Sequence, residues 1–318
     1  MNTVRPGPYL NHLVAFHSPE NPNRHAHFGL WPEASPIRES SFHEAQHALV
    51  ARILRTAGLR NGEVILDLGC GIGGTLEVIN SYHHGMQLTG LNLDPRQLAI
   101  CRTLEPRHAN TMNWIAADAV ELPFRSNSMH QVLCIEAMFH FQSRRTLFRE
   151  VHRVLRSGGS VTFSDIILNP GEEIAAIEAR EDVPEQGGKP CTRGTTGTSA
   201  TGTSATGTSA TDNTPAMATT SAGHGLMNWI RGGFGSWPDP NLLEGSHKAL
   251  ALEAGLTEIL IDEITQNTWP THRHTLPPDL DRSTDPTDPI LRASLALETL
   301  HRSGSLRYVI GRASKPGT

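Results

Sequence analysis

The sequence predicts an α/β protein built on a mostly parallel, doubly wound sheet. Short apolar runs that suit strands alternate with stretches of helical periodicity from residue 63 to residue 167. Parallel strands joined by helices require such alternation, because each crossover returns the chain to the same end of the sheet. The 318 residues suffice for one sizeable core, and no apolar run reaches the length that crosses a membrane.

The first half of the chain supplies most of the predicted elements. Residues 1–40 are rich in Pro, His and Asn with little periodicity, so we expect an irregular arm over the ligand site. Ser41 and Glu44 form a capping box, which predicts a helix from there to about Ala57. Strands are predicted over residues 63–68, 87–92, 113–117, 131–136 and 160–167, and helices over 75–82, 95–104 and 144–155.

A low-complexity segment interrupts this pattern. Thr196–Ala210 is three copies of Thr-Gly-Thr-Ser-Ala and cannot bury a core, so we expect a flexible insertion over 184–223. The other parts are the arm (1–40), a ligand-binding core (41–183), and a lid remainder with the C-terminal part of the fold (224–318). Regular structure is predicted over 226–230, in helices over 240–254 and 289–301, and in strands over 258–264 and 306–312, which complete a seven-stranded sheet.

Composition narrows the class of partner. The net charge of −5 without a Lys/Arg stripe disfavours nucleic acid and anionic membrane, and favours a small-molecule substrate. The four cysteines lack metal-ligand spacing, and no leader segment is evident, so we expect reduced thiols and a cytoplasmic protein. His43 and His47 lie one helical turn apart, but nothing completes a zinc site, so no metal is predicted. The oligomeric state is not predicted.

A glycine-rich turn follows the first predicted strand. Gly69, Gly71 and Gly74 fit the dinucleotide pattern, and Asp94 lies about where its ribose-binding acid would be. Asp67 favours a different ligand, because a carboxylate at this turn would repel a pyrophosphate. S-adenosylmethionine carries an ammonium and a sulfonium and no phosphate. Asp67 could therefore pair with its amino group, while the glycines let the backbone approach.

Four motifs together resemble the class I S-adenosylmethionine-dependent methyltransferases, closely over residues 25–180 and loosely over 225–318. The motifs are Asp67–Gly71, Thr89–Pro95, Ala117–Phe124 and Arg153–Gly159. The resemblance implies a Rossmann-like, seven-stranded sheet with helices on both faces. Among family members, the small-molecule O-methyltransferases that tailor sugars and polyketides look most similar.

The resemblance also implies which residues bind the cofactor. Asn92 stands where many members have an acid for the ribose, and Gln97 can supply a second contact. Asp118 would accept a hydrogen bond from the adenine amine, unless it only caps its loop. Asp94 is better explained as a helix N-cap before Pro95. The predicted cofactor-binding residues are Asp67, Gly69, Gly71, Asn92, Leu93, Gln97, Asp118, Ala119 and Glu136.

Transfer of a methyl group to a hydroxyl requires a base for the hydroxyl proton. His140 follows the fourth strand, in a segment that resembles the acceptor side of sugar and polyketide O-methyltransferases. Asp165 could orient its imidazole or take the proton, although His140 could also serve only packing. His27 and Trp31 resemble an arm that closes over the methionine portion.

We therefore predict an S-adenosylmethionine-dependent methyltransferase that acts on a hydroxyl of a small natural product of secondary metabolism. The alternatives are an N- or C-methyltransferase, a non-catalytic cofactor-binding protein, and a dinucleotide oxidoreductase. Asp67 counts against the last of these.

Overall fold

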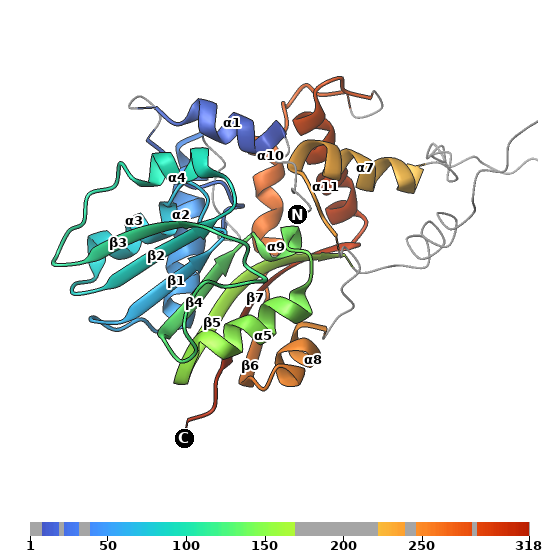
Figure 1. Cartoon of the computed structure of the whole chain (residues 1–318). Helices are drawn as coiled ribbons and strands as arrows, with labels where there is room; N and C mark the ends of the chain where they lie inside the picture. Colours follow the sequence, from blue (N-terminus) through green and yellow to red (C-terminus); the bar gives the residue numbers. More distant parts are fainter. Residues whose placement is uncertain are drawn as a thin grey trace, which may run out of the picture.

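The computed structural model of the chain describes residues 8–18, 22–31, 39–168, 222–238, 246–281 and 285–317. These residues form a seven-stranded sheet covered by helices on both faces (Figure 1), which confirms the predicted fold class. The strands are β1 (Val64–Leu68), β2 (Gln87–Asn92), β3 (Thr111–Ala116), β4 (Met129–Ile135), β5 (Leu155–Leu168), β6 (Thr257–Glu263) and β7 (Leu306–Ser314).

The sheet order is β3-β2-β1-β4-β5-β7-β6. Strands β1 to β5 pair in parallel, and β7 lies antiparallel between β5 and β6. Because the strand order reverses at β1, a crevice opens outside the carboxyl ends of β1 and β4. The tips of β1, β2 and β4 therefore place Leu68, Asn92 and Ile135 at one edge of the sheet.

The helices divide between the two faces of the sheet and a layer above its carboxyl edge. In Figure 1, α5 and α8 cover one face, α2 and α3 cover the other, and α1, α7 and α11 lie above the edge. The helices are α1 (Pro8–Phe16), α2 (Glu39–Ala57), α3 (Gly74–Tyr82), α4 (Pro95–Cys101), α5 (Arg144–Val154), α7 (Ala222–Phe234), α8 (Ser246–Glu253), α9 (Thr265–Thr268), α10 (His272–Thr275), α11 (Pro289–Arg302), and the 3₁₀ turns η1 (Met138–His140) and η2 (Trp269–Thr271).

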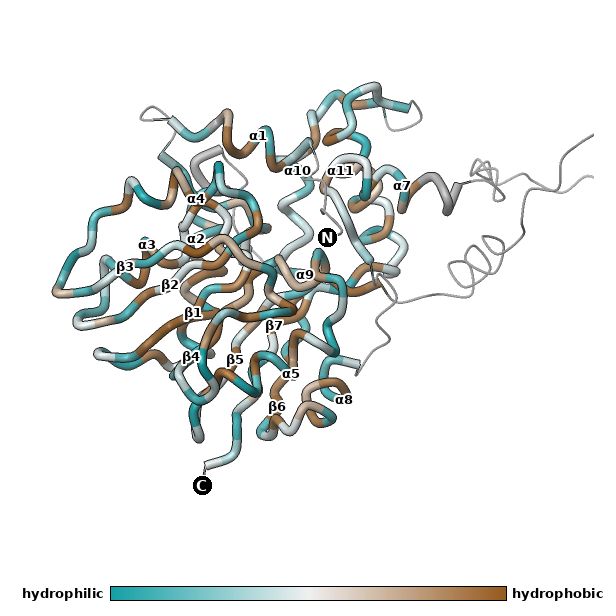
Figure 2. Tube along the Cα trace, viewed as in Figure 1, coloured by the Kyte–Doolittle hydropathy of each residue, from teal (hydrophilic) through white to brown (hydrophobic). Residues whose placement is uncertain are grey.

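The central strands are apolar on both faces because helices cover both. Leu66 and Val132 pack toward α5, whereas Ile65 and Leu133 pack toward α2 and α3. Figure 2 shows this continuous apolar character as brown along β1 and β4. Parallel strands that are buried on both faces are nearly uninterrupted apolar runs. The short apolar runs between helical stretches in the sequence therefore predicted these strands correctly.

Several predicted boundaries were wrong. The arm is not wholly irregular, because residues 8–16 form α1. Helix α2 begins at Glu39, so Ser41 lies inside the helix and is not its N-cap. Strand β5 begins at Leu155, where pairing with Met129 extends it beyond the predicted start at 160. The ends of these helices and of β5 depend on tertiary pairing and packing, which local propensity does not predict.

The predicted insertion is only partly described. Its three Thr-Gly-Thr-Ser-Ala copies lie outside the described residues, and α7 begins at Ala222, inside the range predicted to be flexible. Cys191 also falls outside, whereas the other three cysteines are free and buried. Within the described ranges, no helix combines the length and apolar character needed to span a bilayer.

Candidate functional site

A cavity of about 510 Å³ opens at the carboxyl edge of the sheet, between the tips of β1, β2 and β4 and helices α1 and α7. Its size lies within the range of small-molecule sites. The predicted residues that line it are Asp67, Gly69, Gly71, Asn92, Leu93, Gln97, Ala119, Glu136 and His140. Asp118 and Asp165 do not line it.

Asp67 presents a buried carboxyl group to the cavity. The residue is 2% exposed, and its Oδ2 atom has no hydrogen-bond partner among the described residues. Burial raises its pKa to about 8, so the group is mostly protonated at neutral pH. A buried oxygen without a partner costs free energy. The carboxyl group is therefore suited to a ligand that brings a donor, and above all to a cationic one.

The turn after β1 brings backbone close to the cavity. Gly69 has φ +68°, and a Cβ there would lie 2.4 Å from the Cβ of Ala137, so no larger residue fits. Gly71 also has a positive φ, yet a Cβ there would meet nothing within 4 Å. Gly71 thus leaves room where a ligand can lie against the main chain.

The tip of β2 carries an amide pair. Asn92 Nδ2 donates to Gln97 Oε1 at 2.9 Å, and Gln97 Nε2 is buried without a partner in the described structure. Asp94 accepts from the backbone N–H of Arg96 and caps α4 with Pro95 at its first position, which confirms the predicted N-cap. The amide of Gln97 is therefore the group at this tip with a free donor for a ligand hydroxyl.

Asp118 occupies the loop after β3. Its Oδ1 accepts from the backbone N–H of Val120 at 3.0 Å, so it caps its own turn. Its neighbours Ala117 and Ala119 line the cavity, and Asp118 itself does not. The loop-cap interpretation has a bond to support it, whereas the adenine contact stays a prediction.

Glu136 is a buried acid that joins the N-terminal arm to the sheet. Its Oε1 accepts from the backbone N–H of Phe28 at 2.7 Å and from Tyr308 Oη at 2.5 Å. Its backbone is left-handed, with φ +47°, which costs free energy in a residue other than glycine. Burial raises its pKa to about 7, although these two hydrogen bonds favour the charged form.

Glu136→Gln should change how stability depends on pH. Because the folded pKa is raised from 4.5 to about 7, the folded state holds this proton longer than the unfolded state. The free energy of unfolding of the natural protein should therefore fall as pH rises from about 4.5 to 7. The variant should show a shallower fall, measured by urea unfolding across this range. In the control variant Glu121→Gln, which changes an exposed acid, the free energy of unfolding should fall with pH as steeply as in the natural protein.

His140 lies on η1 and lines the cavity. Its Nδ1 is 2.8 Å from the carbonyl oxygen of Ser236, which can only accept, so Nδ1 carries the proton. Nε2 has no hydrogen-bond partner in the described part of the chain. Burial is the main cause that lowers its pKa below 6.5, so the imidazole is neutral at pH 7 with a basic Nε2. This is the state required of a general base.

The structure corrects the role predicted for Asp165. Its carboxylate is fully buried and is held by Arg144, at 2.8 Å from Nε, and by His247 Nε2 at 2.7 Å. Burial opposes its charge, but Arg144 and His247 outweigh burial and lower its pKa. The carbonyl of Ser236, and not Asp165, orients His140. Asp165 instead ties α5 and α8 to β5.

Asp165→Asn should strongly destabilise the fold. The substitution removes the charge that compensates the buried Arg144 guanidinium, and breaking a buried pair costs about 3–5 kcal/mol. Chemical denaturation should show this loss in the free energy of unfolding. Asp262→Asn, on the exposed pair with Arg52, should cost under about 0.5 kcal/mol. A similar small effect in Asp165→Asn would contradict the role assigned to this pair.

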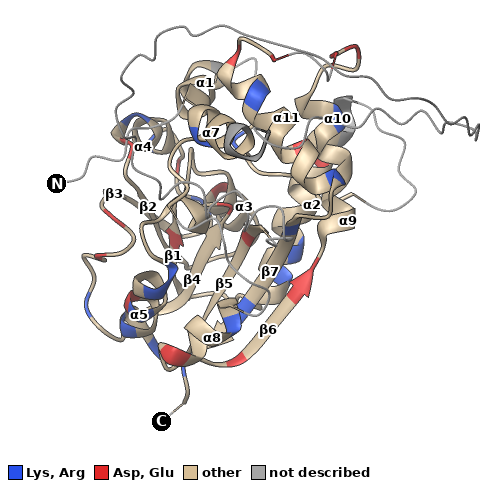
Figure 3. Cartoon of the chain, turned by 90° about the vertical axis from the view of Figure 1, so that its right-hand side faces the viewer, with Lys and Arg blue, Asp and Glu red and all other residues tan. Residues whose placement is uncertain are grey.

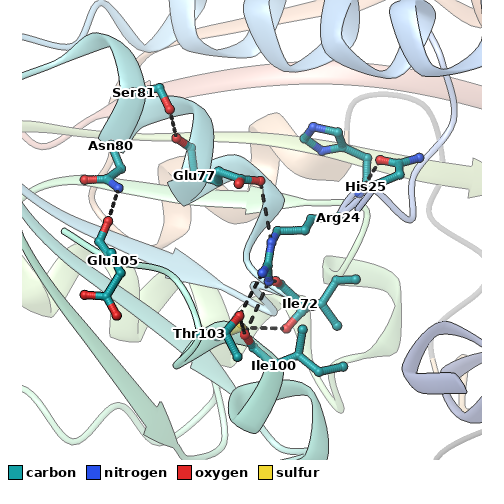
Figure 4. Close-up of polar contacts among 12 residues, drawn as sticks. Arg24, His25, Ile72, Glu77, Asn80, Ser81, Ile100, Thr103 and Glu105 are labelled. Atoms are coloured by element: carbon teal, nitrogen blue, oxygen red, sulfur yellow. Dashed lines mark hydrogen bonds and ion pairs between the residues drawn. The ribbon is translucent and has the colours of Figure 1, made fainter. Parts of the chain in front are cut away.

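An extended strap, residues 22–31, closes one side of the cavity. Figure 4 shows the Arg24 guanidinium beside Ile72, Ile100 and Thr103, where it donates to the carbonyls of Ile72 and Ile100 and to Thr103 Oγ1. His27 lines the cavity as predicted, whereas Trp31 packs against Thr271 and His274 and does not. Only one of the two predicted arm residues thus reaches the cavity.

The histidines near the strap form no recognised metal site. His43 and His47 contact each other through Nε2 atoms 3.1 Å apart, and His25 lies beside them. Among the described residues, no group of three or more His, Cys, Asp or Glu could hold a metal ion. Burial is the main cause that lowers the pKa of His25 to about 2 and of His27 to about 4, so both are neutral.

Sequence reasoning missed the roof of the cavity. Tyr9, Leu10 and Leu13 of α1 line it, together with Phe234 and Ser236 at the end of α7. No local motif marks these residues, because they reach the cavity only through packing of α1 on α7. The apolar face of residues 9–13 was the one available signal, and it is too short to indicate a site.

Comparisons with known proteins give the cavity a chemical context. Residues 66–163 match the family model described as a methyltransferase domain. The chain is 30% identical over 147 residues to an O-methyltransferase of Aspergillus nomiae, across 46% of this chain and 64% of that protein. It is 30% identical over 165 residues to the 27-O-demethylrifamycin SV methyltransferase of Amycolatopsis mediterranei, across 51% of this chain and 58% of that protein. The chain thus spans less than two thirds of either relative.

Solved structures resemble nearly the whole chain. The [4+2]-cyclase SpnF has a TM-score of 0.61 at 18% identity, across 99% of this chain and 98% of that chain. The geranyl diphosphate C-methyltransferase of Streptomyces coelicolor, solved with Mg²⁺, geranyl diphosphate and S-adenosyl-L-homocysteine, has a TM-score of 0.60 at 16% identity, across 97% and 98%. Likeness at this level of identity extends to the fold alone.

Proposed function

Because the chain belongs to the class I S-adenosylmethionine-dependent methyltransferases, we propose that it transfers a methyl group from this cofactor to a hydroxyl of a small molecule. The observation that carries the proposal is the pairing of two groups in one cavity. One is a buried carboxyl group with an unpartnered oxygen, and the other is a neutral imidazole with a free nitrogen. These are Asp67 and His140. The fold alone would not suffice, since a cyclase shares it.

The cavity residues suit S-adenosylmethionine. Asp67 Oδ2 would accept from the amino group of the methionine portion, beside the open backbone at Gly71. Gln97 Nε2, held by Asn92, would donate to a ribose hydroxyl. The other predicted contacts, on the ribose and adenine side of the cofactor, are Leu93, Ala119, Glu136 and Asp118. A diphosphate fits poorly, because among the described lining residues both arginines are engaged elsewhere and would not compensate its charge beside Asp67.

His140 would act as the base. The bound cofactor supplies an electrophilic methyl on its sulfonium. Nε2 would accept the hydroxyl proton while the acceptor oxygen forms its bond to that methyl carbon and the methyl–sulfur bond breaks, with its electron pair staying on the sulfur of the departing S-adenosyl-L-homocysteine. Ser236 holds the ring by the opposite nitrogen, which fixes both its tautomer and its direction. Oxygen is favoured over nitrogen as the acceptor, because a neutral amine can attack the methyl group before it loses a proton, whereas a hydroxyl needs a base.

Two measurements test this proposal. Calorimetry should show binding of S-adenosyl-L-homocysteine and none of NAD, and the reverse result would overturn it. Turnover with a labelled methyl donor, across alcohols, phenols, amines and carbon nucleophiles, should then place label in an ether product. If the label appears in an amine or on carbon, the acceptor is a nitrogen or carbon nucleophile and not a hydroxyl. Cofactor binding with no transfer at all would favour the non-catalytic alternative.

A further inference from the structure

The cavity has an apolar roof, and the described residues that line it offer no unengaged positive charge. We propose that the acceptor is a neutral, largely apolar molecule and that anionic acceptors, such as phosphates and carboxylates, are excluded. This inference rests on the proposed function for the identity of the site, but its evidence is separate. It comes from the apolar side chains and the arginines of the lining, which the proposed function does not use.

The roof is built from apolar side chains of helices distant in sequence. Leu10 and Leu13 come from α1, which carries no Asp, Glu, Lys or Arg and is tan along its length in Figure 3. Phe234 comes from α7 and meets the ring of Tyr9 edge-on, with centroids 5.2 Å apart. Phe141 adds a further apolar side chain to the lining, near Gly69. A ligand gains free energy here by covering apolar surface.

Both arginines that line the cavity are already engaged by the protein. The Arg24 guanidinium donates to two carbonyls and to Thr103 and lies 3.6 Å from Glu77 (Figure 4). Arg96 donates to both carboxylate oxygens of Asp94 and to Asn11. Neither can serve an acceptor anion without giving up these bonds, and lost charge-assisted bonds are expensive.

The other titratable groups in the cavity wall also oppose an anion. His25 and His27 are held neutral by burial and so offer no charge. Asp67 and Glu136 are acids, and either becomes negative when it ionises. An anion buried beside them would have no compensating charge among the described lining residues, and such burial is strongly unfavourable. A neutral acceptor avoids this cost entirely.

A matched pair of dyes tests the inference on the full chain loaded with S-adenosyl-L-homocysteine. N-phenyl-1-naphthylamine is neutral, and 1-anilinonaphthalene-8-sulfonate is the same skeleton with a sulfonate. Fluorescence titration should show the neutral dye binding at least about tenfold more tightly. Leu13→Ala should weaken the neutral dye about fivefold, since it removes part of the roof. Leu13→Arg should reverse the preference, and Leu260→Arg, on exposed β6, should leave it unchanged.

Equal affinity for the two dyes, tighter binding of the sulfonate, or binding of neither would overturn the inference. The inference would also be overturned if neither substitution at Leu13 changed the affinity for the neutral dye. The dye preference does not require turnover, so it can hold even where methyl transfer fails. Conversely, methyl transfer to phosphate- or carboxylate-bearing acceptors would remove this inference and leave the proposed function intact.

Discussion

His140→Gln should lower turnover of a hydroxyl acceptor by about 10²- to 10⁴-fold, the contribution typical of a positioned base. Glutamine can still donate to the Ser236 carbonyl, which now binds Nδ1 at 2.8 Å, but it has no basic nitrogen. The affinity for S-adenosyl-L-homocysteine should stay within about twofold, because the role proposed for the imidazole is toward the acceptor hydroxyl. Labelled-methyl turnover and calorimetry measure the two quantities separately.

The pH profile distinguishes a base from a packing residue. Since burial lowers the pKa of His140 below 6.5, the natural enzyme should lose activity only at a pH below that value. In His140→Gln this acid limb should disappear from kcat/KM. His152→Ala removes a histidine from α5 that does not line the cavity, and it should keep both rate and limb. An unchanged kcat in His140→Gln would assign His140 to packing alone.

The sequence identified those parts of the fold that local patterns control. Strand β2 was predicted with its observed bounds, because its two leucines lie between the polar ends Gln87 and Asn92. The cap of Asp94 and Pro95 on α4 was predicted because one turn contains all of it. By contrast, the early start of β5 depends on pairing with β4, and α1 depends on packing against α7. The local sequence of neither partner indicates such a contact.

The same distinction separates the predicted residues that line the cavity from those that do not. Asp67, Gly69 and Gly71 line the cavity because one strand and its turn place them there. The partner of His140 was missed, because Ser236 lies 96 positions away and no local pattern connects the two residues. Asp165 was misassigned for the same reason, since position at a strand end does not reveal that Arg144 and His247 already bind its carboxylate.

Asp67→Asn should weaken S-adenosyl-L-homocysteine by about 2–5 kcal/mol, roughly 30- to 5000-fold, because it removes the charged partner of the ligand amino group. The fold should tolerate the change. With a pKa of about 8, Asp67 is mostly neutral at pH 7 in the protein without ligand, so the amide alters little charge there. The melting temperature without ligand should be close to that of the natural protein, and the rise on adding ligand should be lost.

Proton release gives the sharper form of this prediction. At pH 6.5 the carboxyl group is protonated before binding, because its pKa is about 8. An ammonium held against it favours the carboxylate, so binding should release close to one proton. Calorimetry in buffers of different ionisation enthalpy measures this number directly. The affinity of the natural protein should also rise with pH toward 8, since less free energy is then spent on deprotonation.

The two variants of the test isolate Asp67 from other acids. Glu121→Gln removes an exposed carboxyl group outside the cavity and should leave the released proton in place. Asp67→Asn should abolish the release while retaining any residual binding. If the natural protein binds S-adenosyl-L-homocysteine with no proton released, or if Asp67→Asn binds it as tightly, the ligand amino group does not pair with this carboxylate. Either result would leave the orphaned Oδ2 atom without its proposed partner.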